Sequence, residues 1–362
     1  MAFVEPKFSR SQVNRAGDIL IAPEKFSVEE QEWSSSVLAN WRACHGYPMN
    51  TFQATLRQKL KAVDASAIVA QRLKRAPSIV LKLQRFEGMQ LARMQDIGGL
   101  RAVLGSVGKV RQLEGAYRSA HFKHDLASSK NYIDEPKRDG YRSIHLIYKY
   151  RNDGADVFNG LSLELQFRTR LQHAWATAVE TMGTFLGQAL KSGQGESQWR
   201  RFFSVAGAAL AVMEKTASVP GFETSRDRDV FEALADTEQE LRVLEKLSGF
   251  AIAASKITTE RGHGAYHLIV LDSLNRRVSI RPYPVSRLEQ ANIDYAAFEQ
   301  RTKAGEPIEA VLVSAGPIDA LYKAYPNYFL DTQEFVKQIS AIISDVRKQG
   351  SHAKAARSTL RK

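Results

Sequence analysis

The chain has 362 residues, of which 44% are hydrophobic and 25% are charged, as in ordinary globular proteins with room for two domains. The apolar runs are too short to cross a bilayer, and the first ten residues lack the apolar core of a signal peptide. The one cysteine excludes an intramolecular disulfide. We therefore expect a cytoplasmic protein without a membrane segment. The net charge of +12 favours a polyanionic partner such as nucleic acid, with a basic protein that binds no nucleic acid as the alternative.

Helical periodicity dominates the first quarter of the chain, and strands then alternate with helices. We predict helices over residues 28–46, 50–75, 77–89, 107–121 and 170–192, with strands over 100–105, 142–150 and 161–168. Strands interleaved with helices indicate a mixed α+β domain.

The second half begins with helices and ends in a different pattern. We predict helices over residues 198–217, 226–247 and 330–349, a hairpin from 265–273 and 276–285 that turns at Leu274 and Asn275, and a further strand over 308–316. We therefore expect a first domain over residues 1–195, a helical connector over 196–248, and a small C-terminal α/β domain over 249–362.

The first group of candidate site residues is basic. Lys74, Ser78 and Lys82 are spaced by four, so on one helix they would present two ammonium groups and a hydroxyl on the same face, with Arg72 nearby. Such a face can bind a triphosphate, although a solvated basic helix face is the alternative.

The second group is Asp96 and Arg101, where a carboxylate precedes an apolar strand. A carboxylate at the mouth of a strand can bind Mg²⁺, and the planar guanidinium of Arg101 suits stacking on an adenine ring. A surface ion pair is the alternative.

The third group lies in a basic loop that leads into a strand. Gly140 marks a turn, Tyr141 offers a ring for base stacking, and positive charge comes from Lys137, Arg138 and Arg142. His145 follows on the strand, where a buried core histidine is the default interpretation.

The fourth group is Glu164 with Gln166 and Arg168. Glu164 is an isolated carboxylate in an apolar alternation of strand residues. Together with Asp96 it could bind Mg²⁺ and accept a proton from an attacking hydroxyl, whereas a carboxylate paired with a neighbouring arginine is the alternative.

The order of these motifs resembles the RelA/SpoT synthetase domain, a nucleotidyltransferase-like fold. The motifs are RxKxxxSxxxK, DIxGxR, YxxxPKxxGYxSxH and ELQxRT, followed by HxW, and they cover roughly residues 50–190. The resemblance implies transfer of the β,γ-pyrophosphate of ATP to a 3′-hydroxyl. No His-Asp pair occurs in the first 70 residues, so it implies a synthetase without the family's hydrolase.

Residue roles follow from the resemblance. Arg72 and Arg101 would enclose the adenine, Lys74, Ser78 and Lys82 would hold phosphates, and Asp96 and Glu164 would bind Mg²⁺, with Glu164 activating the acceptor hydroxyl. Tyr141 would stack on the acceptor base, with Lys137, Arg138, Gly140, Arg142 and His145 around the acceptor and Gln166 and Arg168 beside Glu164.

The C-terminal segment carries Tyr322, Tyr325 and Tyr328 at a spacing of three, with Pro326 preventing an ordinary continuous helix. This pattern resembles the YxxY element in the neutralising pseudo-zinc-finger domain of CapRel-type fused toxin–antitoxin synthetases, and a tyrosine-rich core corner is the alternative. Either Tyr322 with Tyr325 or Tyr325 with Tyr328 could be the pair, and we favour the second.

The resulting hypothesis is a pyrophosphokinase that modifies the 3′ CCA end of tRNA, is inhibited by its own C-terminal domain, and is triggered by a phage structural protein. The alternatives are a synthetase of (p)ppGpp or (p)ppApp and a non-catalytic RNA-binding regulator. The sequence does not define the oligomeric state.

Overall fold

The structure is a computed structural model that describes residues 3–119, 122–186, 190, 195–259, 265–272, 274–275, 277–304, 306, 308–314 and 328–359. The chain divides into two compact units, Met1–Ile133 with Ser143–Arg170, and Asp134–Arg142 with Leu171–Lys362. This division falls at residue 170, whereas the sequence suggested a domain boundary at 195, and it assigns the basic loop to the second unit. The predicted division into a first domain over residues 1–195, a connector over 196–248 and a C-terminal domain over 249–362 stays a prediction.

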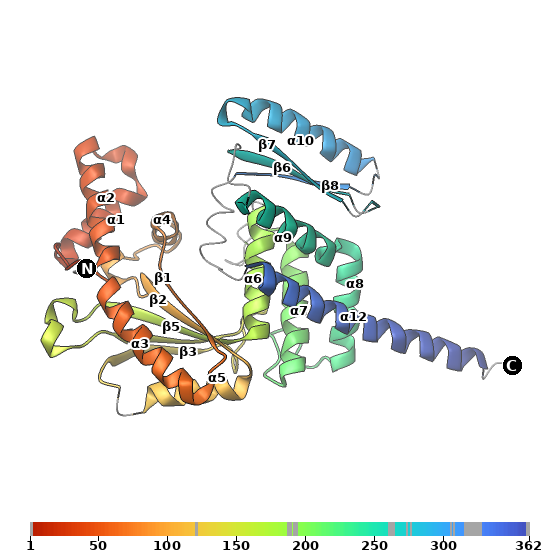
Figure 1. Cartoon of the computed structure of the whole chain (residues 1–362), viewed down its shortest axis with the longest axis horizontal. Helices are drawn as coiled ribbons and strands as arrows, with labels where there is room; N and C mark the ends of the chain where they lie inside the picture. Colours follow the sequence, from red (N-terminus) through yellow and green to blue (C-terminus); the bar gives the residue numbers. More distant parts are fainter. Residues whose placement is uncertain are drawn as a thin grey trace. The chain divides into compact units, whose positions relative to one another are not determined.

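Unit 1 combines helices with a five-stranded sheet (Figure 1). Its elements are α1 (Arg10–Ile21), α2 (Val28–Ala43), α3 (Gly46–Val63), β1 (Ile68–Leu73), α4 (Ala76–Arg85), β2 (Gly98–Leu104), α5 (Val107–Arg118), β3 (Asp125–Asn131), β4 (Ile144–Lys149) and β5 (Ser162–Thr169). The strand order is β1-β2-β5-β4-β3, in which β2 and β5 are parallel and the other neighbours antiparallel.

One face of this sheet forms the core of unit 1. Leu100, Leu146 and Leu165 on the three central strands are buried together with Phe52 of α3 and Leu113 of α5. Because side chains alternate along a strand, the intervening residues point to the opposite face. That second face is where the polar residues of the central strands lie.

Both edge strands of the sheet differ from the prediction. Residues 68–73 form β1 rather than the end of a helix over 50–75, because they pair with β2 in an antiparallel ladder. The sequence reading also missed β3, which pairs with β4, and α1, which begins in a capping box between Ser9 and Gln12. Edge strands are paired on one side only and are often polar, so they lack a clear alternation.

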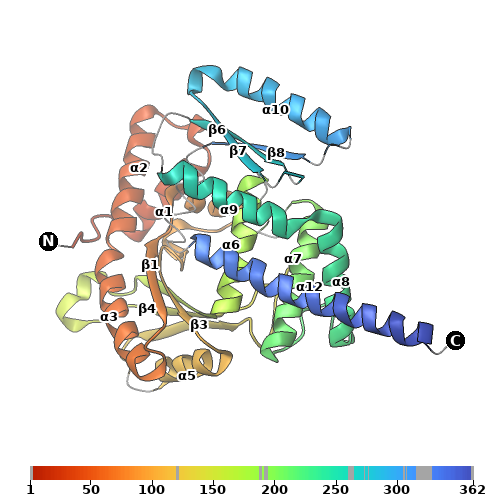
Figure 2. The ribbon, with the colours of Figure 1, turned by 45° about the vertical axis from the view of Figure 1, so that its right-hand side comes forward.

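Unit 2 begins with helices, continues with a second sheet, and ends in a long helix (Figure 2). Its elements are α6 (Arg170–Phe185), α7 (Ser197–Glu214), α8 (Asp227–Leu241), α9 (Val243–Thr259), β6 (Tyr266–Asp272), β7 (Arg277–Tyr283), α10 (Leu288–Lys303), β8 (Ile308–Ser314) and α12 (Tyr328–Thr359). Helix α10 was not predicted, and the helix predicted over 226–247 is two helices, because Arg242 takes a left-handed conformation between α8 and α9.

The second sheet lies between α9 and α10, and both views show this layering (Figures 1 and 2). Strand β6 is its centre, with β7 and β8 antiparallel on either side, so the predicted hairpin and third strand are confirmed. Leu268 and Val270 face the α10 side, while Ile269 and Leu271 pack with the α9 core. Burial on both faces explains the unbroken apolar run of β6.

The mixed α+β class predicted from the sequence is confirmed. Within the part of the chain that the structure describes, no helix is both long and apolar enough to span a membrane.

Candidate functional site

The open face of the unit 1 sheet collects five of the predicted site residues. Gly99 of β2 is paired with Arg72 on one side and Glu164 on the other, and Arg101 is paired with Gln166. Gln166 in turn is paired with His145. Because residues directly opposite each other on neighbouring strands point to the same face, these side chains share one surface. The pairing of β2 with β5 also confirms that Asp96 and Glu164 belong to adjacent strands or their mouths.

Asp96 lies in the turn before β2 and accepts from two lysines. Lys74 Nζ is 2.9 Å from Oδ2, and Lys82 Nζ is 2.9 Å from Oδ1. Burial opposes the charge of Asp96, but the charges and hydrogen bonds of the two lysines outweigh it and hold the pKa of Asp96 below its ordinary value. The carboxylate is therefore ionised at neutral pH and surrounded by positive charge.

The two lysines reach Asp96 from different elements, which corrects the expectation that they share a helix face. Lys74 follows β1, and its backbone N–H donates to Ile97 O at 2.7 Å. Its own carbonyl accepts from Arg42 Nε at 2.8 Å. Lys82 lies on α4 one turn after Ser78, which is exposed. A strand end and a helix thus bring the charges together.

Glu164 is held by two hydrogen bonds on the open face. Its Oε1 is 2.8 Å from His145 Nδ1, and its Oε2 accepts from Gln166 Nε2 at 2.7 Å. Burial would raise the pKa of Glu164, but the His145 hydrogen bond and charge, followed by Gln166 and Arg168, lower it to about 2. Glu164 is therefore a firmly ionised carboxylate.

Arg168 supports this arrangement from within unit 1. Its side chain is buried, with Nη2 donating to Gln166 Oε1 at 3.0 Å and Nε lying 3.4 Å from Ser143 Oγ. Gln166 is thus oriented so that its amide nitrogen faces Glu164. The proximity of Arg168 and Glu164 expected from the sequence is confirmed, although Gln166 mediates between them.

Two ionised carboxylates, one in the turn before β2 and one on the neighbouring strand β5, offer the hard oxygen ligands that Mg²⁺ prefers. Mg²⁺ sites in proteins use one or two carboxylates plus substrate phosphates. Arg72 is exposed and Arg101 is half-buried on the same face of β1 and β2. The donor set therefore fits a metal–nucleotide site in its chemistry.

The predicted acceptor loop belongs to unit 2. Lys137 and Arg138 are exposed, and Lys137 Nζ lies 5.0 Å from the centroid of the Tyr141 ring. Tyr141 is half-buried, with its ring 6.2 Å from that of Trp175. Gly140 has a φ of +92°, which explains the glycine at this turn.

Arg142 is placed differently from the other loop cations. Its guanidinium is buried and donates through Nη1 to Glu214 Oε2 at 2.6 Å and to Thr216 Oγ1 at 3.2 Å. Burial lowers the pKa of Arg142, and Glu214 opposes this shift. In this conformation Arg142 anchors the loop, and no sequence signal identified Glu214 as its partner.

Tyr322 and Tyr325 lie outside the described residues. The described part of the chain resumes at Tyr328, the first residue of α12, but its side chain lies outside the described part. The break expected at Pro326 also lies outside the described residues. The YxxY element therefore stays a prediction.

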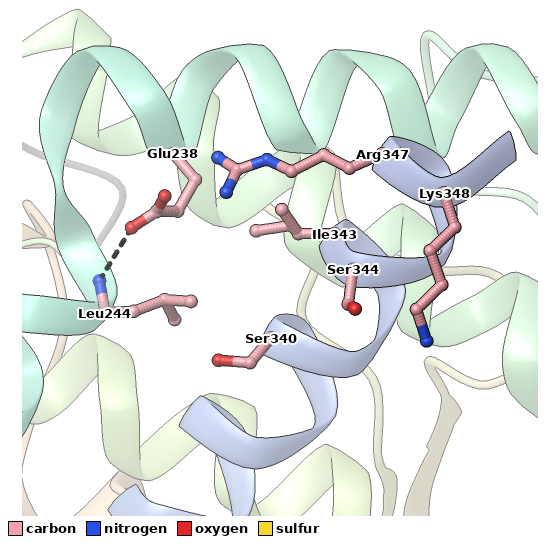
Figure 3. A pocket seen from close by; sticks show the side chains of 7 residues that line it. All are labelled: Glu238, Leu244, Ser340, Ile343, Ser344, Arg347 and Lys348. Carbon is pink, nitrogen blue, oxygen red and sulfur yellow. Dashed lines mark hydrogen bonds between the residues drawn. The ribbon is translucent and has the colours of Figure 1, made fainter. Parts of the chain in front are cut away.

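A separate groove in unit 2 has a volume of about 460 Å³, and its lining, among the residues that the structure describes, contains none of the predicted site residues (Figure 3). Helix α12 contributes most of its lining, and α8 and α9 supply Glu238 and Leu244. Glu238 Oε1 accepts from the backbone N–H of Leu244 at 3.3 Å, which caps the start of α9. The Arg347 side chain extends toward Glu238 across the groove (Figure 3).

The site region matches a known protein family. Residues 71–183 match the family described as the region found in RelA / SpoT proteins. This segment contains all of the open-face residues together with the acceptor loop.

Curated relatives agree with that match. The chain is 32% identical over 139 residues to the GTP pyrophosphokinase YjbM of Bacillus subtilis, covering 35% of this chain and 65% of the relative. It is 26% identical over 180 residues to the chloroplastic GTP diphosphokinase CRSH1 of Oryza sativa, covering 46% of this chain and 30% of the relative. The chain thus spans less than two thirds of the length of these relatives.

A solved structure of small alarmone synthetase 1 from Bacillus subtilis bound to its product pppGpp is also similar. It is 22% identical, covers 51% of this chain and 94% of that protein, and has a TM-score of 0.41.

Proposed function

We propose that the RelA/SpoT region of this chain is a Mg²⁺-assisted pyrophosphokinase. In the reaction, the 3′-hydroxyl oxygen of an acceptor bonds to the β-phosphorus of ATP and its proton passes to water. The bond from that phosphorus to the α–β bridging oxygen breaks, and AMP leaves with that oxygen. The observation that carries the proposal is the open sheet face, on which Arg72, Arg101, Glu164, Gln166 and His145 lie together.

The donor side rests on the contacts of Asp96. Lys74 and Lys82 already neutralise one carboxylate, so ATP phosphates entering this position would find both ammonium groups close together. Ser78 lies one helical turn before Lys82 and would add a hydroxyl donor. Arg72 and Arg101 would hold the adenine through their planar guanidinium groups.

Asp96 and Glu164 would hold Mg²⁺, which when bound would neutralise charge on the transferred phosphates. A pKa of about 2 makes Glu164 a strong candidate ligand but a weak proton acceptor. The low pKa therefore supports the metal-binding role of Glu164 more than the expected role as general base.

For the acceptor we propose the 3′ CCA end of tRNA. The supporting observations are the net charge of +12 and the exposed Lys137 and Arg138 beside Tyr141, because flexible single strands bind by stacking and positive charge. A guanosine nucleotide is the second candidate, and the names of the relatives as GTP pyrophosphokinase and GTP diphosphokinase favour it. An adenosine nucleotide acceptor is the corresponding (p)ppApp variant.

Regulation is proposed from the sequence resemblance. Residues 249–362 would act as a neutralising domain through Tyr325 and Tyr328, with Tyr322 in the alternative pair, and a phage structural protein would relieve the inhibition.

The test is to incubate the purified protein with ATP labelled in the γ-phosphate, Mg²⁺, and either deacylated tRNA or GDP. We expect label in the 3′-terminal nucleotide of tRNA together with release of AMP. Label only in a guanosine nucleotide would refute the tRNA acceptor and retain the chemistry, whereas transfer to neither acceptor, nor to an adenosine nucleotide, would refute the pyrophosphokinase itself.

A further inference from the structure

The loop Asp134–Arg142 is grouped with unit 2, although the chain on both sides of it, at Ile133 and Ser143, belongs to unit 1. Helix α7 contacts this loop at Arg138, Gly140 and Arg142. It lies beyond residue 183, where the match to the RelA/SpoT region ends. The position of the loop therefore depends on residues outside that region.

Two glycines form the centre of the contact. A Cβ atom added to Gly207 of α7 would lie 2.5 Å from Gly140 Cα and 2.7 Å from Gly140 O. A Cβ atom added to Gly140 would lie 2.9 Å from Phe203 O. The loop backbone thus rests directly on the helix backbone, and any side chain at either position would force the two apart.

Polar contacts hold the loop on both sides of the glycine pair. Ser204 Oγ donates to Arg138 O at 2.7 Å on one side. On the other side, Arg142 pairs with Glu214, and the two side chains are 1% and 8% exposed. Gln172 Nε2 also donates to Glu214 Oε2, at 3.1 Å. A buried, hydrogen-bonded ion pair tolerates little displacement of either partner.

The same helix also holds the residue beside Tyr141. Trp175 Nε1 donates to Phe203 O at 2.9 Å, and the Trp175 ring lies against the Tyr141 ring. Lys137 and Arg138 remain exposed. Helix α7 thus holds the loop backbone, while the side chains of the two cations are exposed on the loop surface beside Tyr141.

We infer that α7 is a positioning element for the acceptor, with Gly207 and Ser204 setting the place of Tyr141, Lys137 and Arg138. This inference rests on the proposed function, because it takes the loop to be the acceptor site. A loop held in one conformation binds its ligand without the entropic cost of ordering. The affinity for the acceptor therefore depends partly on Gly207 and Ser204, which would contact neither ATP nor the reacting atoms.

The test is Gly207→Ala, with Gly115→Ala as a matched control, because a Cβ atom at helical Gly115 meets nothing within 4 Å. We expect the acceptor KM of Gly207→Ala to rise with little change in kcat or in the affinity for an ATP analogue. The added methyl group must displace the loop by roughly 1 Å. We therefore expect kcat/KM for the acceptor to fall by about 100-fold, through the rise in KM. Gly115→Ala should retain the parent values.

A second variant covers the case in which Gly207→Ala does not fold. Ser204→Ala removes only the hydrogen bond to Arg138 O and should raise the acceptor KM by about 10-fold, whereas Ser204→Thr keeps the hydroxyl and should restore it. An unchanged acceptor KM in every folded variant would overturn the inference.

Hydrogen exchange separates this inference from the proposed function. The Gly140 N–H donates to Lys137 O at 2.9 Å, so the loop amides should exchange slowly in the parent protein and faster in the α7 variants. Equal exchange in all proteins would refute anchoring by α7. A different result would be faster exchange in the α7 variants together with a parent protein that transfers pyrophosphate to no acceptor. It would confirm the anchoring but refute the proposed function, and α7 would then have no positioning role.

Discussion

His145 donates through Nδ1 to Oε1 of Glu164 over 2.8 Å, and the two residues lie on neighbouring strands of one sheet. Sequence alone gave His145 a default role as a core histidine or a place near the acceptor. The structure makes it a direct partner of the central carboxylate.

Glu164→Gln removes the charge and keeps the size of the side chain. We expect pyrophosphate transfer to fall by more than about 100-fold, because loss of even an outer-shell partner of a metal ligand costs about 10- to 100-fold. ATP-analogue binding and the thermal midpoint are the controls for folding. Transfer at the parent rate would contradict the metal-binding role.

Lys82→Ala removes one of the two cations on Asp96. We expect the KM for ATP to rise by about 10-fold, equivalent to about 1.4 kcal/mol, while the acceptor KM stays constant. Lys61→Ala is the matched control, because Lys61 is exposed on α3 and belongs to no predicted site. Steady-state kinetics with varied ATP measure the difference, and equal KM values in the two variants would count against phosphate binding by Lys82.

Gly98→Ala tests the packing beneath the site. A Cβ atom at Gly98 would lie 2.7 Å from Leu163 Cδ2 and 3.0 Å from Met49 Sδ in the core. We expect a loss of about 1–3 kcal/mol in the free energy of unfolding, measured in urea. Gly99→Ala is the control, since its nearest neighbour would be 3.7 Å away. Similar losses in both variants would contradict the assignment of the two faces.

His124 predicts a pH dependence of stability. Its ring stacks on Phe52 and Tyr150, and Nδ1 accepts from the Arg151 N–H at 3.0 Å. Burial, with a smaller effect of Lys123, lowers the pKa of His124 from 6.5 to about 4. Between pH 6.5 and about pH 4, His124 binds more protons in the unfolded chain than in the folded protein. The stabilisation of the folded protein by neutral His124 is therefore complete above pH 6.5 and is lost as the pH falls to about 4.

We expect His124 to contribute a loss of up to about 3 kcal/mol in the free energy of unfolding across this window. Urea titrations at several pH values measure it. His124→Asn keeps an acceptor for the Arg151 N–H and removes the titrating group. The slope of its free energy of unfolding against pH should therefore be smaller than that of the parent by up to the contribution of one proton. His45, whose pKa burial also lowers to about 4, contributes a slope of the same sign in both proteins. Identical slopes would show that His124 is not the titrating group.

Tyr328→Ala tests autoinhibition. If the C-terminal residues restrain the enzyme, expression of this variant should stop growth in the absence of phage, and protein synthesis should fall as tRNA ends are blocked. The double variant with Glu164→Gln should be harmless, which ties the toxicity to catalysis. Normal growth of cells that express Tyr328→Ala would argue against neutralisation by this element.

The central strands β2 and β5 were predictable because much of each alternates between buried and partly buried residues. The edge strands β1 and β3 were not, since partly exposed strands such as residues 68–73 consist of side chains that also suit a helix. Helix α9 was merged with α8 because nothing in the sequence indicates the left-handed conformation of Arg242. The hairpin of β6 and β7 was predictable, since its turn and its two apolar runs are local signals.

The sequence alone determined which chemical groups the site contains, because motif spacing is a local property of the chain: the acids Asp96 and Glu164, the lysines around them, and the basic Gly-Tyr loop. Only the tertiary structure decided how these groups are paired. Strand register placed Glu164 beside His145, and a strand end and a helix together brought Lys74 and Lys82 to Asp96. The packing of the loop on α7 placed Arg142 beside Glu214. Such pairings join residues far apart in sequence, so they depend on how strands and helices pack rather than on local spacing.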